Sequence, residues 1–207
     1  MELYYSPGAC SLATHIVSRE AGLPVSLVRV DLGTKKTETG ADYLAINGKG
    51  YVPAIRFEDD GEVMTEVATL VQVLADKNPA AGLAPALGTK ERYRLMEWLT
   101  FIGSELHKGF GPLWHPETPA ETKAAVKEKL ATRFAWLEKQ LTGRDYLVGT
   151  RFSVADAYAF TILNWAGMLN VDLAAYPNIR SFMARVGARP KVQEALRAEG
   201  LLRDKAA

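Results

Sequence analysis

The chain has 207 residues, of which 48% are hydrophobic and 24% charged, and its net charge is +1, as in a globular protein of one or two domains. This charge supplies no field to attract nucleic acid or a membrane, and no apolar run approaches the roughly 20 residues that span a bilayer. A single cysteine excludes an internal disulfide, and the start MELYYSPG lacks the regions of a signal peptide, so we expect a cytoplasmic protein.

The first residues alternate short strands with a helix. ELYY at 2–5 is a β-prone run that ends at a Ser-Pro-Gly turn. The spacing of apolar residues predicts a helix over 11–21, and the alternation in 26–32 predicts a second strand. Because the helix has the length of a crossover connection, we expect these two strands to be parallel. The polar stretch 33–42 reads as a loop, with a short helix near 42–46.

A hairpin and a helix follow. The runs 52–58 and 61–65 flank Asp-Asp-Gly, and Asp-Gly between apolar runs is a strong hairpin signal. We expect Thr65 to cap a helix that ends at Asn78. The order β-α-β, loop, β-β-α is that of a thioredoxin-like domain. The sequence therefore predicts such a domain over 1–80, with a mixed four-stranded sheet.

The second half has a different pattern. Residues 80–88 are small, apolar and rich in Gly and Pro, and read as a linker. No strand pattern follows, so we expect an all-α domain, a helical bundle, over 88–207. Its helices are predicted over 89–111, over 119–142, from a capping box at Ser153, from Pro177 in the first turn, and over 191–199.

Cys10 stands directly after a Pro-Gly turn, where the first helix is predicted to begin. Most free cysteines are small buried hydrophobic residues, and this is one interpretation. The other is a reactive thiol, because unpaired N–H groups and the helix dipole stabilise a thiolate at such a position. The pattern is not Cys-x-x-Cys, so a reacting Cys10 needs a thiol from solution to resolve it. Position alone leaves both interpretations open.

Two later positions also allow either a structural or a ligand-binding interpretation. Pro53 is either a plain strand start or part of a cis bond that turns the backbone of Val52 toward an extended peptide. Glu66 either complements the dipole of the helix that it opens or meets an ammonium group, while the N–H groups of that helix suit a carboxylate.

The segment 89–111 carries a polar stripe that includes Thr100, Ser104 and His107. Such a stripe is usually a solvated face. The opposite face reads as core and holds Leu95, Leu99, Ile102, Leu106 and Phe110. We expect His15 to be structural and His115 to lie in a loop. The three histidines share no metal-ligand spacing, so no metal site is predicted.

Taken together, these segments resemble the glutathione S-transferases, and among them the bacterial beta class. The resemblance runs along the whole chain, and its most specific parts are YYSPGACSLATHI at 4–16, Val52-Pro53, Thr65-Glu66, ELHKGF at 105–110 and RFSVADAY at 151–158. It implies that glutathione, as a co-substrate, lies extended with its sulfur near Cys10. It also implies a homodimer and no further cofactor.

The resemblance further implies particular roles. Cys10, Ser11 and His107 become the candidates for stabilising the glutathione thiolate. The residues expected to bind glutathione or border the second-substrate pocket are Lys35, Val52, Pro53, Glu66, Val67, Thr100, Ser104, Glu105 and His107. The sequence departs from the usual pattern at Val67, where Ser or Gly is common, at Thr100, where Asn is common, and at Gly48, where Pro is frequent.

The predicted function is therefore transfer of the glutathione thiolate to small electrophiles, with thiol–disulfide exchange through Cys10 as a further activity. The residues at positions 67 and 100 leave an alternative, because they give weight to a non-catalytic ligand-binding or interaction protein on the same fold. Neither charge nor motif supports a nucleic-acid binder.

Overall fold

The computed structural model describes residues 1–202 and divides them into two compact units. The first comprises Met1–Ala84 together with the described residues 189–202, and the second comprises Pro85–Ala188. The boundary falls within the predicted linker 80–88, but the last helix groups with the first unit, whereas the sequence placed it with the second. It does so because this helix packs against the first helix of the chain. Within the described residues, no helix has both the length and the apolar character needed to cross a membrane.

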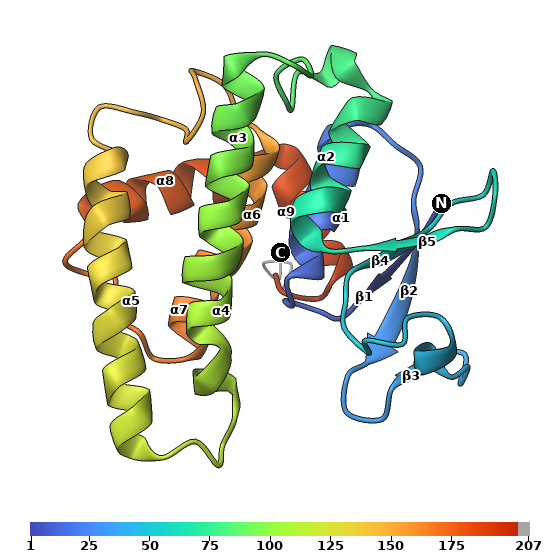
Figure 1. Cartoon of the computed structure of the whole chain (residues 1–207), viewed down its shortest axis with the longest axis horizontal. Coiled ribbons are helices and arrows are strands. Elements are labelled where there is room, and N and C mark those ends of the chain that lie inside the picture. The colour runs from blue at the N-terminus through green and yellow to red at the C-terminus, as the bar shows by residue number, and fades with distance from the viewer. Residues whose placement is uncertain (203–207) are drawn as a thin grey trace, which may run out of the picture. The chain divides into compact units, whose positions relative to one another are not determined.

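The first unit is built on a sheet with the strand order β3-β2-β1-β4-β5. Its elements are β1 (Glu2–Tyr5), α1 (Ser11–Glu20), β2 (Ser26–Asp31), β3 (Lys36–Thr37), the 3-10 turn η1 (Tyr43–Ala45), β4 (Ala54–Arg56), β5 (Val63–Thr65), α2 (Val67–Lys77), the 3-10 turn η2 (Pro79–Ala81) and α9 (Pro190–Ala198). As predicted, β1 and β2 are parallel and β4 and β5 form an antiparallel hairpin. In Figure 1, α1 and α2 run side by side against this sheet.

The sheet has five strands, so the prediction of four was wrong. The additional strand, β3, lies in the polar stretch that was expected to be a loop, and it pairs antiparallel with β2. Asp31 turns the chain here, because its carboxylate accepts the N–H groups of Gly33 and Thr34. Lys35 then adopts a positive φ of 57°. A strand of two residues is too short to show the alternation that reveals strands in a sequence.

The period of two along β1 gives the sheet two buried faces. Leu3 is fully buried, as is its register partner Ile55. Tyr4 points to the opposite side, where it belongs to a buried cluster with Val30, Tyr43, Val52 and Ala54. This second cluster lies beneath the segment that carries Val52, so packing in the core fixes the backbone at that residue.

The second unit is helical throughout its described length. Its elements are α3 (Lys90–Phe101), the π-helical turn η3 (Ile102–His107), α4 (Lys108–Phe110), the 3-10 turn η4 (Gly111–Trp114), α5 (Ala120–Gln140), α6 (Val154–Leu163), α7 (Trp165–Met168) and α8 (Pro177–Gly187). Figure 1 shows α5 running alongside α4. All five apolar positions predicted as core between Leu95 and Phe110 are buried.

All ten residues of α6 are buried. The predicted capping box is present at its start, where Ser153 and Asp156 exchange hydrogen bonds. Asp156 also accepts the N–H of Leu147, at 2.8 Å, which ties the preceding loop to the helix. The capping box is the main sequence signal for this helix, because hydrophobic residues lie on all of its sides and leave no amphipathic pattern.

Candidate active site

Cys10 occupies the N-cap position of α1, after the turn that follows β1. Its side chain is partly buried, and its Sγ lies 3.0 Å from the carbonyl oxygen of Val52, to which the thiol donates. The sulfur therefore faces a backbone carbonyl group of another segment instead of packing as one more apolar core atom. This geometry favours the interpretation of Cys10 as a functional thiol.

Ser11, the next residue, is fully buried. Its hydroxyl oxygen lies 3.2 Å from the N–H of Ser6, from which it accepts, and 3.3 Å from the carbonyl oxygen of Ser6, to which it donates. Both bonds close the turn that carries Cys10. The side chain of Ser11 thus holds the turn together from within, although it was expected to be a candidate for stabilising a thiolate.

The peptide bond between Val52 and Pro53 is cis, which is the second of the two readings that the sequence allowed. The loop before it is held at Tyr51, whose carbonyl accepts the hydroxyl of Tyr43 and the side-chain amide of Asn47, both at 2.7 Å. Burial raises the pKa of Tyr43 to about 12, so this hydroxyl keeps its proton and its donor role. These bonds fix the backbone on which Val52 faces Cys10.

Glu66 forms the N-cap of α2 with a positive φ of 73°. Its carboxylate lies 2.6 Å from the ammonium of Lys49, which also donates to the hydroxyl of Thr65, at 2.7 Å. Thr65 was expected to cap the helix, but it ends β5 instead. The side chain of Glu66 makes no capping hydrogen bond to α2, and Val67 begins the helix as a buried residue.

Lys35 projects from the turn before β3. Its ammonium donates to the carbonyl oxygen of Gly50, at 2.9 Å, in the same loop that leads to Val52. Thus the first unit brings Lys35 next to the loop before Val52, and Val52 next to Cys10. Sequence separation hid these contacts, because no local pattern marks the carbonyl of Gly50 as a partner.

In the helical unit, the predicted polar stripe is only partly a solvated face. The hydroxyl of Thr100 donates to the carbonyl of Met96, and that of Ser104 donates to the carbonyl of Thr100, each at 2.9 Å. Both residues are exposed. The carboxylate of Glu105 lies 2.5 Å from the Nε of Arg133 on α5. An ion pair on the helix surface therefore holds Glu105.

His107 departs from the stripe, because the helix changes pitch just before it. A π-helical turn carries one more residue per hydrogen-bonded ring than an α-helix, and such turns are frequent at functional sites. The Nδ1 of His107 lies 2.7 Å from the hydroxyl of Tyr158 on α6. The imidazole ring also packs edge to face against Trp165, with the centroids 5.0 Å apart.

Tyr158 was not predicted as a site residue. The signal for it was a tyrosine within the mostly apolar segment of α6, because a buried tyrosine hydroxyl needs a hydrogen-bond partner. The remaining predicted residues lie as follows: Lys35, Val52, Pro53, Glu66 and Val67 in the first unit with Cys10 and Ser11, and Thr100, Ser104, Glu105 and His107 in the helical unit. His15 is buried, as expected, and His115 is exposed.

Two protein-family models match the chain. The model described as the glutathione S-transferase N-terminal domain covers residues 8–77, and that of the C-terminal domain covers residues 101–190. Among curated proteins, glutathione S-transferase GstA of Escherichia coli O157:H7 is 46% identical over 97% of this chain and 100% of its own length.

Solved structures give the same result. A sphingomonad glutathione S-transferase complexed with glutathione is 48% identical, with a TM-score of 0.94, over 98% of this chain and all of its own. A bacterial beta class glutathione S-transferase of Sphingomonas chungbukensis is 45% identical, with a TM-score of 0.95 and the same coverage. The similarity spans both units.

Proposed function

Since the chain belongs to the glutathione S-transferase family and resembles its bacterial beta class, we propose that glutathione binds along the first unit with its sulfur beside Cys10. The protein is a glutathione transferase, which joins the glutathione thiolate to a small electrophile. The non-catalytic alternative is therefore not retained. Holding the two reactants together lowers the entropic part of the barrier.

The contact between Cys10 and Val52 is the observation that carries this proposal. A backbone segment that ends in a cis proline and faces a thiol provides donors and acceptors for an extended peptide. When glutathione pairs with Val52, its cysteinyl sulfur comes close to the Sγ of Cys10. Pro53 keeps this segment out of the ladder of the sheet, because it has no N–H to donate.

The two ends of glutathione are both charged. We assign the γ-glutamyl end to Glu66, whose carboxylate suits the ammonium group, and to the N–H of Val67 at the start of α2, which suits the carboxylate. Lys35 supplies a positive charge for the other carboxylate. The side chain of Val67 lacks a hydroxyl, so only its backbone contributes.

In the helical unit, Thr100, Ser104 and His107 border the second-substrate pocket in this proposal. His107 is our proposed candidate for stabilising the thiolate, and within the helical unit its ring is oriented by Tyr158 and Trp165. Glu105 acts through its ion pair with Arg133, which keeps that turn in place. Ser11 has no part in the chemistry, since its hydroxyl is bonded to Ser6.

Cys10 also supports thiol–disulfide exchange. Its thiolate attacks a disulfide between glutathione and a second thiol, forms a bond to the glutathione sulfur and expels the second thiolate. A free glutathione thiolate then attacks this mixed disulfide, which releases oxidised glutathione and restores Cys10. No second cysteine is available to resolve the intermediate, so glutathione performs that step.

The assembly and location follow from the same proposal. We expect a homodimer, the usual form in this family, and a cytoplasmic protein, since glutathione keeps the thiols of that compartment reduced. The electrophile is a small molecule, and no metal or further cofactor takes part.

Replacing Cys10 by Ala separates the two activities. Conjugation of glutathione to an aryl halide is expected to persist in Cys10→Ala, while glutathione-dependent disulfide reduction disappears. Tyr146→Phe is the control, because Tyr146 packs against Phe152 in the helical unit and the variant leaves the thiol and its turn unaltered, so it should retain both activities. Disulfide reduction that continues in Cys10→Ala would remove the redox role.

A further inference from the structure

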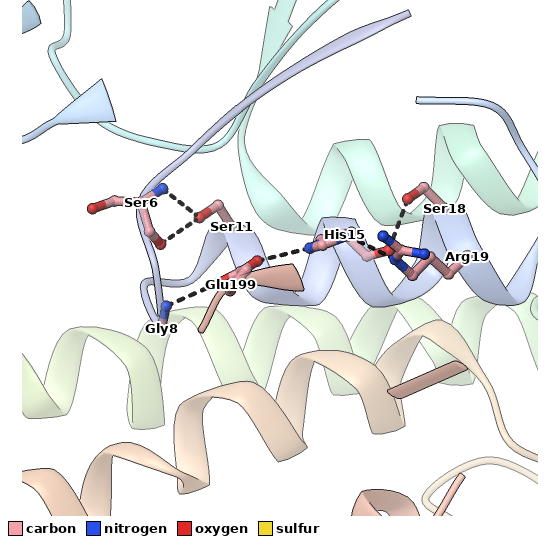
Figure 2. A network of polar contacts seen from close by, with 7 residues as sticks. All are labelled: Ser6, Gly8, Ser11, His15, Ser18, Arg19 and Glu199. Carbon is pink, nitrogen blue, oxygen red and sulfur yellow. Dashed lines mark hydrogen bonds and ion pairs between the residues drawn. The ribbon is translucent and has the colours of Figure 1, made fainter. Parts of the chain in front are cut away.

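Glu199, at the C-terminal end of α9, carries a carboxylate that is buried in the first unit. Its Oε2 accepts a hydrogen bond from the backbone N–H of Gly8, and its Oε1 contacts the Nδ1 of His15. Both distances are 2.9 Å. Its side chain is fully buried, and that of His15 is 2% exposed. Figure 2 shows that Glu199 reaches the turn before α1 and the middle of α1 at the same time.

The hydrogen bonds assign the proton on His15. The Nε of Arg19 donates to the Nε2 of His15, at 2.8 Å, so Nε2 is the acceptor and carries no proton. The ring proton is then on Nδ1, which donates to Glu199. A neutral imidazole thus links the guanidinium of Arg19 to the carboxylate of Glu199. Buried charge is tolerated when its hydrogen bonds are satisfied in this way.

The same carboxylate holds the turn that carries Cys10. Gly8 adopts a positive φ of 72°, a conformation suited to glycine. The N–H of Ala9 donates to the carbonyl of Ser6, at 3.0 Å, and Ser11 bonds to Ser6 from within the turn. Glu199 supplies an anchor from a segment 191 residues away along the chain. Only Ala9 stands between this anchor at Gly8 and the thiol of Cys10.

We propose that Glu199 is a positioning residue for Cys10: through the N–H of Gly8 it fixes the turn on which the thiol faces Val52. It does not touch the reacting atoms. The proposal concerns the thiol itself, so it goes beyond glutathione binding and can be tested without glutathione. It also gives α9 a role in the chemistry of the N-terminal segment, in addition to packing on α1.

The test is the rate at which iodoacetamide alkylates Cys10, measured against pH in the full chain. Because Cys10 is the only cysteine, alkylation reports one sulfur. Glu199→Gln keeps the size of the side chain but replaces one carboxylate oxygen by an amide N–H₂. The N–H of Gly8 or the Nδ1–H of His15 then loses its acceptor. The loosened turn is expected to raise the limiting alkylation rate about fivefold, the factor that one lost hydrogen bond represents.

Glu194→Gln is the matched control, because Glu194 is on the same helix, pairs with Arg19 at 3.6 Å and with Lys191, and is partly exposed. It should leave the alkylation profile unchanged. An equal change in both variants, or a Glu199→Gln variant that unfolds at lower temperature while Cys10 reacts as in the unaltered protein, would overturn the proposal.

A second measurement on the unaltered protein covers the case in which Glu199→Gln does not fold. Hydrogen exchange at the Gly8 amide should be as slow as at the amides within α1, because a buried carboxylate accepts that N–H. Exchange of Gly8 at the rate of exposed loop amides would also overturn the proposal. Neither readout involves glutathione, so failure here is distinguishable from failure of the proposed binding mode.

Discussion

The hydroxyl of Tyr158 and the Nδ1 of His107 lie 2.7 Å apart, and the two rings meet edge to face with their centroids 5.8 Å apart. This contact joins the π-helical turn to the buried helix α6. Tyr158 is 3% exposed, so its ring has little freedom to move. It follows that Tyr158 fixes the orientation of the His107 ring.

Replacing Tyr158 by Phe removes that bond and keeps the ring. We expect kcat/KM for an aryl halide to fall about fivefold to tenfold, the effect of one hydrogen bond of this kind, and the pH dependence of kcat/KM to change with it. Steady-state kinetics across pH provides the measurement. Tyr146→Phe is the control, because Tyr146 packs against Phe152 instead. Wild-type kinetics in Tyr158→Phe would show that His107 does not depend on this contact.

Glu66 is expected to contribute through its charge. Glu66→Gln keeps the shape of the side chain but loses the carboxylate assigned to the ammonium of glutathione. Because the group is largely exposed, water screens part of the effect, and we expect the KM for glutathione to rise about fivefold to tenfold with kcat little changed. Initial rates at varied glutathione concentration test this.

Lys49→Gln is the matched control for that experiment. It breaks the same ion pair from the other side and leaves the carboxylate of Glu66 in place. The KM for glutathione should not rise in this variant. A rise of equal size in both variants would mean that the pair only maintains the loop, and that Glu66 does not meet the ligand.

Asp156 makes stability depend on pH. Burial raises the pKa of its carboxyl group to about 6, although hydrogen bonds, among them those from Leu147 and Ser153, oppose this shift. The folded state therefore holds this proton more tightly than the unfolded state does. This proton contributes roughly 3 kcal/mol to the free energy of unfolding. The contribution is fully present below the unfolded pKa of about 4 and is lost as the pH rises through about 6.

Urea unfolding of the unaltered protein and of Asp156→Asn, at about pH 4 and about pH 7, isolates this contribution. The variant has no titrating group at this position, so other groups cancel in the difference. The unaltered protein should lose stability relative to the variant between the two pH values. A difference that stays constant, or that grows in favour of the unaltered protein, contradicts the assigned shift.

Long or strongly patterned elements were readable from the sequence. The strand 2–5, the hairpin around Asp60-Gly61, the capping box at Ser153 and the apolar face around Leu99 each have a local cause that lies within a few residues. The sequence also marked Cys10 correctly as the start of a helix. These features depend on turn chemistry and periodicity, which a single sequence displays.

Features that depend on distant partners were not readable. The strand β3 exists because β2 pairs with it, and the inward turn of His107 results from a π-helical turn and from Tyr158, 51 residues further along the chain. The contact of Glu199 with Gly8 spans 191 residues. Nothing in the local pattern of either segment indicates the other, so only the folded chain reveals these contacts.

The central claim is that the thiol of Cys10 lies in the glutathione site. It can be tested by alkylating Cys10 with iodoacetamide in the presence of S-methylglutathione, which has no thiol, at concentrations shown by calorimetry to saturate the protein. The bound analogue should place its sulfur in front of Cys10 and slow alkylation at least about tenfold. Alkylation at an unchanged rate with the analogue fully bound would contradict the account.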